Sequence, residues 1–89
     1  GYDIQSFDEL GNKIFIEVKS TKGKNKSFFE ISDNEIRAAK EHGDSYYIYQ
    51  VTSALTNPKI STVINNLHNY EDQDKVLIEP ILHRVTFKE

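Results

Sequence analysis

The chain has 89 residues, 37% of them hydrophobic, and no cysteine, so it holds one small core and excludes disulfides and thiolate metal sites. No stretch approaches the roughly 18 consecutive apolar residues of a membrane span, and the lack of cysteine fits a reducing compartment, so we expect a cytoplasmic domain without membrane contact. The net charge of −3 argues against a protein that coats nucleic acid through bulk charge alone.

The first 20 residues predict a β-hairpin. Two segments rich in β-branched and aromatic residues, GYDIQSF and KIFIEVKS, flank a turn that contains Gly11-Asn12. By the period-2 rule, one face of the second strand is apolar and consists of Ile14, Ile16 and Val18. The opposite face of this strand carries a polar pair, Glu17 and Lys19.

A Lys-rich loop comes next, followed by a predicted short strand over SFFEI, residues 27–31, and a helix. Ser32 is placed as the helix N-cap, Glu35 as its capping-box partner three residues later, and Gly43 as the left-handed C-cap. These signals predict a helix of about ten residues, Asp33 to His42. We take the capping box as a sufficient explanation of Glu35 and assign it no chemistry.

The second half of the chain predicts two more strands and an irregular tail. SYYIYQV, residues 45–51, is almost continuously apolar, which is typical of a central strand, and KISTVI, residues 59–64, predicts another. Residues 65–75 are polar, with at most one helical turn, and residues 76–87 predict a strand interrupted at Pro80. The pattern indicates an α/β fold, a mixed sheet of four to five strands with one clear helix.

The hairpin geometry places candidate metal ligands together. A turn at this point pairs residues whose numbers sum to about 19 or 20, so Asp3 should lie opposite or diagonal to Glu17. Two carboxylates so placed repel each other unless a cation lies between them, and Mg²⁺ prefers hard oxygen ligands of this kind. Lys19, one pleat repeat from Glu17, would orient or activate a metal-bound water, or neutralise negative charge on a phosphate in the transition state. The alternative is a solvent-facing polar strip in which Lys19 pairs with a carboxylate.

Asp3 followed by Glu17-Val18-Lys19 resembles the motif of the PD-(D/E)xK nuclease superfamily. The wider pattern, GYDI and FIEVKST followed by FFEIS and IYQV, resembles the domain found at the C-terminus of the plant protein NO VEIN and in prokaryotic restriction and phage-defence proteins. This resemblance covers about the first 60 residues. It implies a restriction-endonuclease-like core in which Asp3, Glu17 and the Val18 carbonyl bind Mg²⁺ or Mn²⁺ and Lys19 serves the nucleophilic water.

The function that the resemblance implies is metal-dependent cleavage of DNA by the nuclease module of a restriction or phage-defence protein. The partners would then be DNA and other domains of the parent, such as a helicase or ATPase. Because the chain opens without Met and without a signal peptide, we expect residues 1–89 to be a single nuclease-like domain taken from a longer protein. The alternatives are a catalytically silent module that binds DNA or a partner protein, and a purely structural interaction domain.

A local basic run adjoins the motif strand. It consists of Lys22, Lys24 and Lys26. Lysines at this place could contact DNA phosphates without reading the base sequence. The alternative is a solvated loop that contacts nothing.

Overall fold

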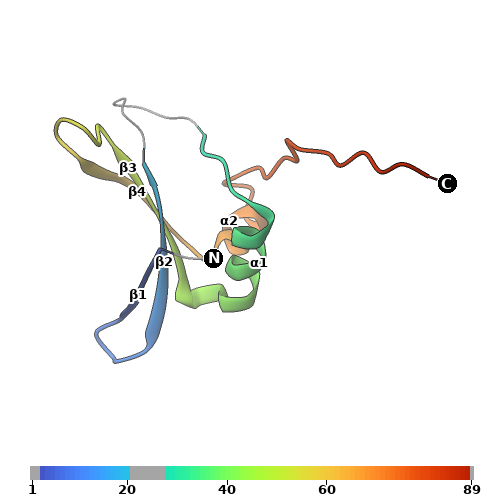
Figure 1. Cartoon of the computed structure of the whole chain (residues 1–89). Coiled ribbons are helices and arrows are strands. Elements are labelled where there is room, and N and C mark those ends of the chain that lie inside the picture. Colours follow the sequence, from blue (N-terminus) through green and yellow to red (C-terminus); the bar gives the residue numbers. More distant parts are fainter. Residues whose placement is uncertain (1–2, 21–27, 89) are drawn as a thin grey trace.

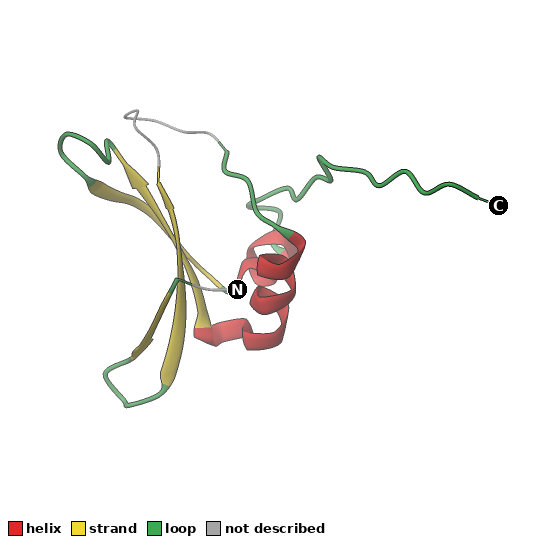
Figure 2. Cartoon of the chain, viewed as in Figure 1, coloured by secondary structure: helices red, strands yellow, loops and turns green. Residues whose placement is uncertain are grey.

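A mixed sheet of four strands, covered on one face by two helices, makes up the domain (Figure 1, Figure 2). The structure is a computed structural model that describes residues 3–20 and 28–88. The strands lie side by side in chain order: β1 (Ile4–Phe7), β2 (Lys13–Ser20), β3 (Tyr46–Thr52) and β4 (Lys59–Asn65). The central pair, β2 and β3, is parallel, and each outer strand is antiparallel to its neighbour.

The predicted N-terminal hairpin is confirmed by β1 and β2. Their register pairs Ile4 with Ile16, so the numbers of paired residues sum to 20. The turn is closed by the Asp8 N–H, which donates to the Asn12 carbonyl at 2.8 Å, and Gly11 adopts the positive φ of 84° that this turn requires.

Helix α1 (Asp33–His42) connects the parallel strands β2 and β3, and its predicted bounds are confirmed, although Gly43, with ψ −118°, does not adopt the predicted left-handed conformation. The capping box is formed by the Glu35 N–H, which donates to the Ser32 Oγ at 3.1 Å, and by the Ser32 N–H, which donates to the Glu35 Oε1 at 2.9 Å. At the other end Gly43, with φ 52°, ends the helix and begins a short 3₁₀ helix, Gly43–Ser45. A connection through a helix is what parallel strands need, because a tight turn cannot join them.

The second helix, α2 (Leu67–Asp72), follows β4 where the sequence indicated at most one helical turn. Asn66 precedes it in the left-handed conformation, and the Asn66 side chain accepts a hydrogen bond from the Asn69 N–H at 3.3 Å. Leu67 is only 3% exposed and anchors the helix on the sheet. No helix in the described ranges is long and apolar enough to cross a membrane.

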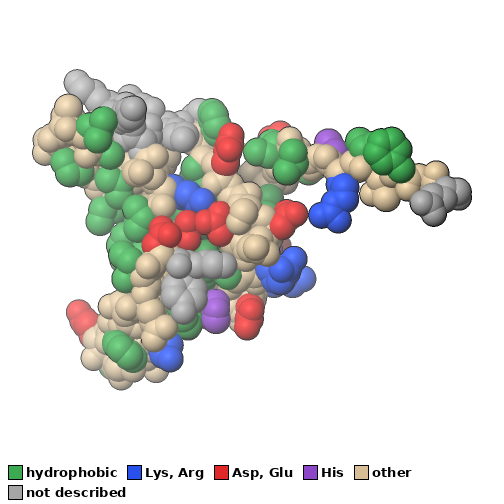
Figure 3. Space-filling view, viewed as in Figure 1, with side chains coloured by type: hydrophobic (Ala, Val, Ile, Leu, Met, Phe, Trp, Pro, Cys, Tyr) green, Lys and Arg blue, Asp and Glu red, His purple; other side chains and the backbone are tan. Residues whose placement is uncertain are grey.

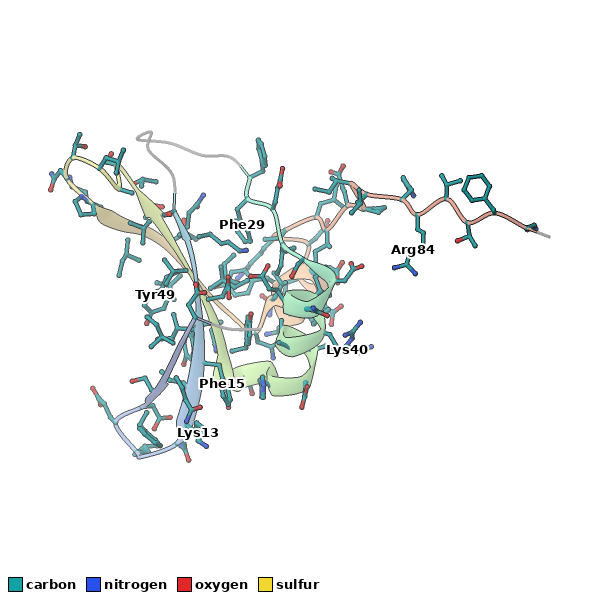
Figure 4. The ribbon with its side chains drawn as sticks, in the orientation of Figure 1. Lys13, Phe15, Phe29, Lys40, Tyr49 and Arg84 are labelled. Atoms are coloured by element: carbon teal, nitrogen blue, oxygen red, sulfur yellow. The ribbon has the colours of Figure 1, made fainter. Side chains whose placement is uncertain are left out.

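The core lies between the helices and one face of the sheet. Its buried residues come from both helices, β3 and β4: Ala38, Ala39, Tyr46, Ile48, Ile64 and Leu67. Alternate residues of β3 are buried, as the period-2 rule requires. Figure 4 shows the consequence, with Phe15 on the helix side of the sheet and Tyr49 pointing to the opposite side.

The predicted strand at residues 27–31 is wrong over the part that the structure describes, residues 28–31. β1 and β3 flank β2, the strand that comes before this segment in the chain, on both sides, so the segment does not continue the sheet beside β2. The side chains of Phe29 and Ile31 instead pack against the core from an irregular segment that leads into α1. The apolar residues of this segment therefore pack against the core and do not form a strand of the sheet.

The predicted strand at residues 76–87 is also wrong, because residues 76–88 form neither helix nor strand. The chain leaves α2 on the helix side and runs away from the sheet (Figure 1). Val76 and Ile78 pack partly against the core. The remaining large apolar side chains of this segment are exposed: Leu77, Ile81, Leu82, Val85 and Phe87. A strand-like pattern forms a strand only where a partner edge is within reach.

Candidate functional site

Polar side chains gather on the helix-facing side of the sheet, at the carboxyl ends of the parallel strands. On β2 this face carries Glu17 and Lys19, and on β3 it carries Gln50 and Thr52. The register pairs Lys19 with Gln50, so the two polar stretches lie side by side. In open sheets with parallel strands, the carboxyl ends of the strands are where ligands bind. Acidic side chains with a basic one beside them are visible between sheet and helices in Figure 3.

Asp3 lies at the edge of this group, next to β2. Its backbone N–H donates to the Ile16 carbonyl at 3.0 Å, and its Oδ2 accepts from the Val18 N–H at 2.8 Å. The hairpin register, continued by one residue, sets Asp3 opposite Glu17, as the sequence predicted. Because the N–H and C=O of one strand residue point to the same edge, the Val18 carbonyl also points toward the Asp3 side of β2.

Glu17 is a buried acid, with 5% of its surface exposed. Burial raises the pKa of Glu17 to about 7, and the hydrogen bond to Glu35 and the negative charges of Glu35 and Asp3 act in the same direction. The Lys19 ammonium, whose Nζ lies 3.5 Å from the Glu17 Oε1, acts against this rise. Near neutral pH, Glu17 is therefore poised between its neutral and ionised forms.

The Lys19 ammonium is held between two carboxyl groups. Its Nζ lies 2.9 Å from the Glu35 Oε1 and 3.0 Å from the Glu35 Oε2, in addition to the longer contact with Glu17. The Lys19 side chain is 19% exposed, so its charge remains accessible from one side. Since Glu35 is ionised near neutral pH and Glu17 can also lose its proton, the two carboxyl groups offset the charge of Lys19, and the group has no surplus positive charge.

Glu35 belongs to this group, although the sequence analysis assigned it to the helix cap alone. Burial opposes its ionisation, but hydrogen bonds from Glu17, the Ser32 N–H and Lys19 together lower the pKa of Glu35 to about 2. The sequence contained a signal for this inward position of Glu35, because residues four apart lie on the same face of a helix. Ala39, four residues after Glu35, is fully buried against the sheet.

Gln50 and Tyr46 are two further residues that the sequence analysis did not place here. Gln50 is 8% exposed and lies across from Lys19, but the almost continuous apolar character of its strand hid this polar position. Tyr46 is fully buried, and burial followed by the charges of Glu17, Glu35 and Asp3 raises the pKa of the Tyr46 hydroxyl. Tyr46 therefore stays neutral and contributes to the low-dielectric floor of the site.

The predicted ligand set consists of two carboxylates, Asp3 and Glu17, and one carbonyl, Val18. These hard oxygens match the preference of Mg²⁺ and Mn²⁺. Across residues 3–20 and 28–88, no three or more His, Asp or Glu side chains are arranged to hold a metal ion. The predicted nucleic-acid contacts Lys22, Lys24 and Lys26 lie outside the described residues.

Comparison with known proteins identifies one family. The family described as Protein NO VEIN, C-terminal matches residues 1–63, a range that contains every site residue discussed above. The "Protein NO VEIN-LIKE" of Arabidopsis thaliana is 38% identical over 56 residues, which are 63% of this chain and 8% of that protein. This chain thus spans a small part of that relative. No solved structure matches. Since the family match covers well over half of the sequence, the chain belongs to the NO VEIN C-terminal family.

Proposed function

We propose that this domain is a metal-dependent nuclease module that cleaves DNA phosphodiester bonds, on a core of the PD-(D/E)xK type. The observation that supports this most is the convergence of Glu17 and Lys19 at the carboxyl ends of parallel strands, with Asp3 beside them. The spacing of these three residues is that of the superfamily motif. A surface strip of unrelated charges would not bury Glu17 to 5% exposure.

In this proposal, Asp3, Glu17 and the Val18 carbonyl hold Mg²⁺ or Mn²⁺. A divalent cation bound there supplies a Lewis acid for the phosphodiester. The Val18 N–H keeps the Asp3 carboxylate turned toward the site. Glu17 would have to be ionised to hold the cation, because only the ionised carboxylate is a good ligand. The Lys19 ammonium stabilises the negative charge that develops on the phosphate in the transition state.

The proposal extends to the setting of the domain. It would act as one module of a longer restriction or phage-defence protein in the cytoplasm, joined to further domains such as a helicase or ATPase. The small share of the Arabidopsis relative that this chain covers, 8%, supports the idea of a module. DNA would be held through its phosphates, with Lys22, Lys24 and Lys26 as sequence-independent contacts.

Plasmid nicking with Mg²⁺ or Mn²⁺ tests the proposal. We expect Lys19→Ala to lower the nicking rate ~10²–10³-fold with little change in metal affinity, because Lys19 acts on the transition state and not on the cation. Glu17→Gln should weaken metal affinity as well as rate, since it removes a charged ligand. Lys40→Ala is the matched control, because Lys40 is an exposed lysine on α1 that points away from the sheet (Figure 4), and it should nick like the wild type.

Two results would contradict the nuclease. If the wild type binds DNA in a salt-sensitive manner but does not nick it with either metal, the catalytically silent DNA-binding module is the better interpretation. If it neither nicks nor binds DNA, a partner-protein or structural interaction domain remains. Full activity of the Lys19→Ala variant would also remove Lys19 from the mechanism.

A further inference from the structure

We propose that Glu35 is the positioning residue of this site: it fixes the Lys19 ammonium beside Glu17 and is itself fixed by the N-terminal cap of α1. The catalytic meaning of this inference rests on the proposed nuclease function, whereas the positioning itself can be measured without it. Glu35 contacts Lys19 and Ser32, and it also accepts a hydrogen bond from Glu17. Its contact with Lys19 is the one that would position the ammonium for the reaction.

The contact distances point to Glu35 as the group that determines where the ammonium lies. The Lys19 Nζ lies 2.9 and 3.0 Å from the two oxygens of Glu35, but 3.5 Å from the nearest oxygen of Glu17. A lysine side chain is flexible, and Lys19 is the last residue but one of β2. Without a two-oxygen partner its ammonium would sample many positions.

Capping accounts for only half of the Glu35 carboxylate. The Ser32 N–H donates to the Oε1, and this one oxygen completes the capping box. The other oxygen, Oε2, accepts from Lys19 at 3.0 Å. The Glu35 side chain is only 17% exposed, and the Lys19 Nζ also lies 2.9 Å from the Oε1, so the ammonium contacts both oxygens whereas the capping box uses one.

The cap gives Glu35 the rigidity that a positioning residue needs. Its backbone N–H is bonded to the Ser32 Oγ at 3.1 Å and its side chain to the Ser32 N–H at 2.9 Å, so both ends of the residue are held. One turn further, Ala39 is fully buried in the core together with Tyr46 and Ile48 of β3, which anchors α1 on the sheet. A continuous set of contacts thus runs from the helix N-terminus through Glu35 to Lys19.

Exact placement of Lys19 matters if it acts on a phosphate. Misplacement of a catalytic group by about 1 Å can cost ~10²-fold in rate. We therefore expect Glu35→Gln to lower the kcat of plasmid nicking ~10–100-fold while KM stays within about twofold. Gln keeps an oxygen for the Ser32 N–H, so this variant preserves the cap and removes the ion pair.

A nuclear magnetic resonance measurement separates positioning from a merely structural role. An ammonium held by two oxygens exchanges its hydrogens slowly, so the wild type should show a Lys19 Nζ signal near 5 °C, identified by its loss in Lys19→Ala. We expect Glu35→Gln to abolish the signal. One control should retain it: Glu41→Gln, which changes an exposed carboxylate of the same helix.

The inference is overturned if the Lys19 signal persists in Glu35→Gln, or if the wild type shows no such signal. The second outcome does not depend on Glu35→Gln, so absence of the signal would overturn the inference even if that variant does not fold. The outcome for the proposed function is separate. A wild-type protein that shows the signal but never nicks DNA would disprove the nuclease and leave the positioning of Lys19 by Glu35 in place.

Discussion

At the scale of single residues, the carboxyl groups of Glu17 and Glu35 behave as a pair that shares one proton. Burial of Glu17 raises its pKa to about 7, while Glu35 accepts the hydrogen bond and keeps its charge, with a pKa of about 2. Two acids with the same chemistry thus take different protonation states because their surroundings differ. The Lys19 ammonium and the helix cap stabilise the ionised form of Glu35, whereas burial favours the protonated form of Glu17.

This pair predicts an unusual dependence of stability on pH in the metal-free protein. Between about 4.5 and about 7 the folded state keeps the Glu17 proton that the unfolded chain releases, so the free energy of unfolding should fall as pH rises through this window. A fall on the order of 1–3 kcal/mol is expected, at about 1.4 kcal/mol for each pKa unit. Below about 4.5 the depressed pKa of Glu35 acts in the opposite sense, and stability should fall as pH decreases toward about 2. Urea unfolding at a series of pH values measures both limbs.

Glu17→Gln is the control for this prediction. The amide still offers an N–H to Glu35 but cannot ionise, so the loss of stability between about 4.5 and about 7 should disappear. The limb at lower pH should remain. If the variant lost stability over the same window as the wild type, other titrating groups would be responsible.

At the scale of elements, α1 connects stability and site through its first turn. Its capping box satisfies backbone N–H groups that the helix itself leaves without partners. The same turn presents Glu35 to Lys19 on β2. Glu35 therefore contributes both to the stability of the helix end and to the position of Lys19 in the site.

We expect Ser32→Ala to lower the free energy of unfolding by about 1 kcal/mol, because it removes the oxygen that accepts the Glu35 N–H. The chemistry of the site should be largely unaffected, since the Glu35 carboxylate and its contact with Lys19 remain. The midpoint of urea unfolding measures the first effect, and plasmid nicking the second. An unchanged midpoint would mean that this cap contributes nothing to stability.

At the scale of the whole molecule, the C-terminal segment separates from the packed domain. The radius of gyration is 15.0 Å, whereas a compact domain of this length would have about 12 Å. Residues 76–88 run outward with large apolar side chains that are 69–92% exposed from Ile81 to Phe87. The sheet and helices form the stable unit, and this segment adds little burial to it.

Ending the chain after Glu79 should therefore leave the thermal midpoint within about 2 °C of the wild type, because the removed side chains are almost fully exposed. Val76 and Ile78, which pack against the core, are retained. The shortened protein should also self-associate less, as judged by light scattering, since an exposed apolar segment is lost. A fall of the midpoint by several degrees would show that the segment packs on the domain in solution.

Local signals in the sequence determined the hairpin and the first helix. The turn at Gly11 sets the register of β1 and β2, which places Asp3 opposite Glu17, and the residues from Ser32 to Gly43 contain both ends of α1. Such features depend on interactions between residues that are close in the chain, so they can be predicted from the sequence. The family, too, was recognisable from the motif residues. The nuclease function and its metal remain predictions.

Only the tertiary structure decided which side chains meet. Gln50 lies beside Lys19 because β2 and β3 pair in parallel across a helix, and Glu35 turns inward because α1 packs on that pair. The two predicted strands that did not form, over residues 28–31 and 76–87, have strand-like sequences but do not pair with the outer edge of β1 or of β4. Whether a strand forms, and which side chains come together, depends on partners that are distant in the sequence. The local pattern of residues does not show which of these distant segments will pack together.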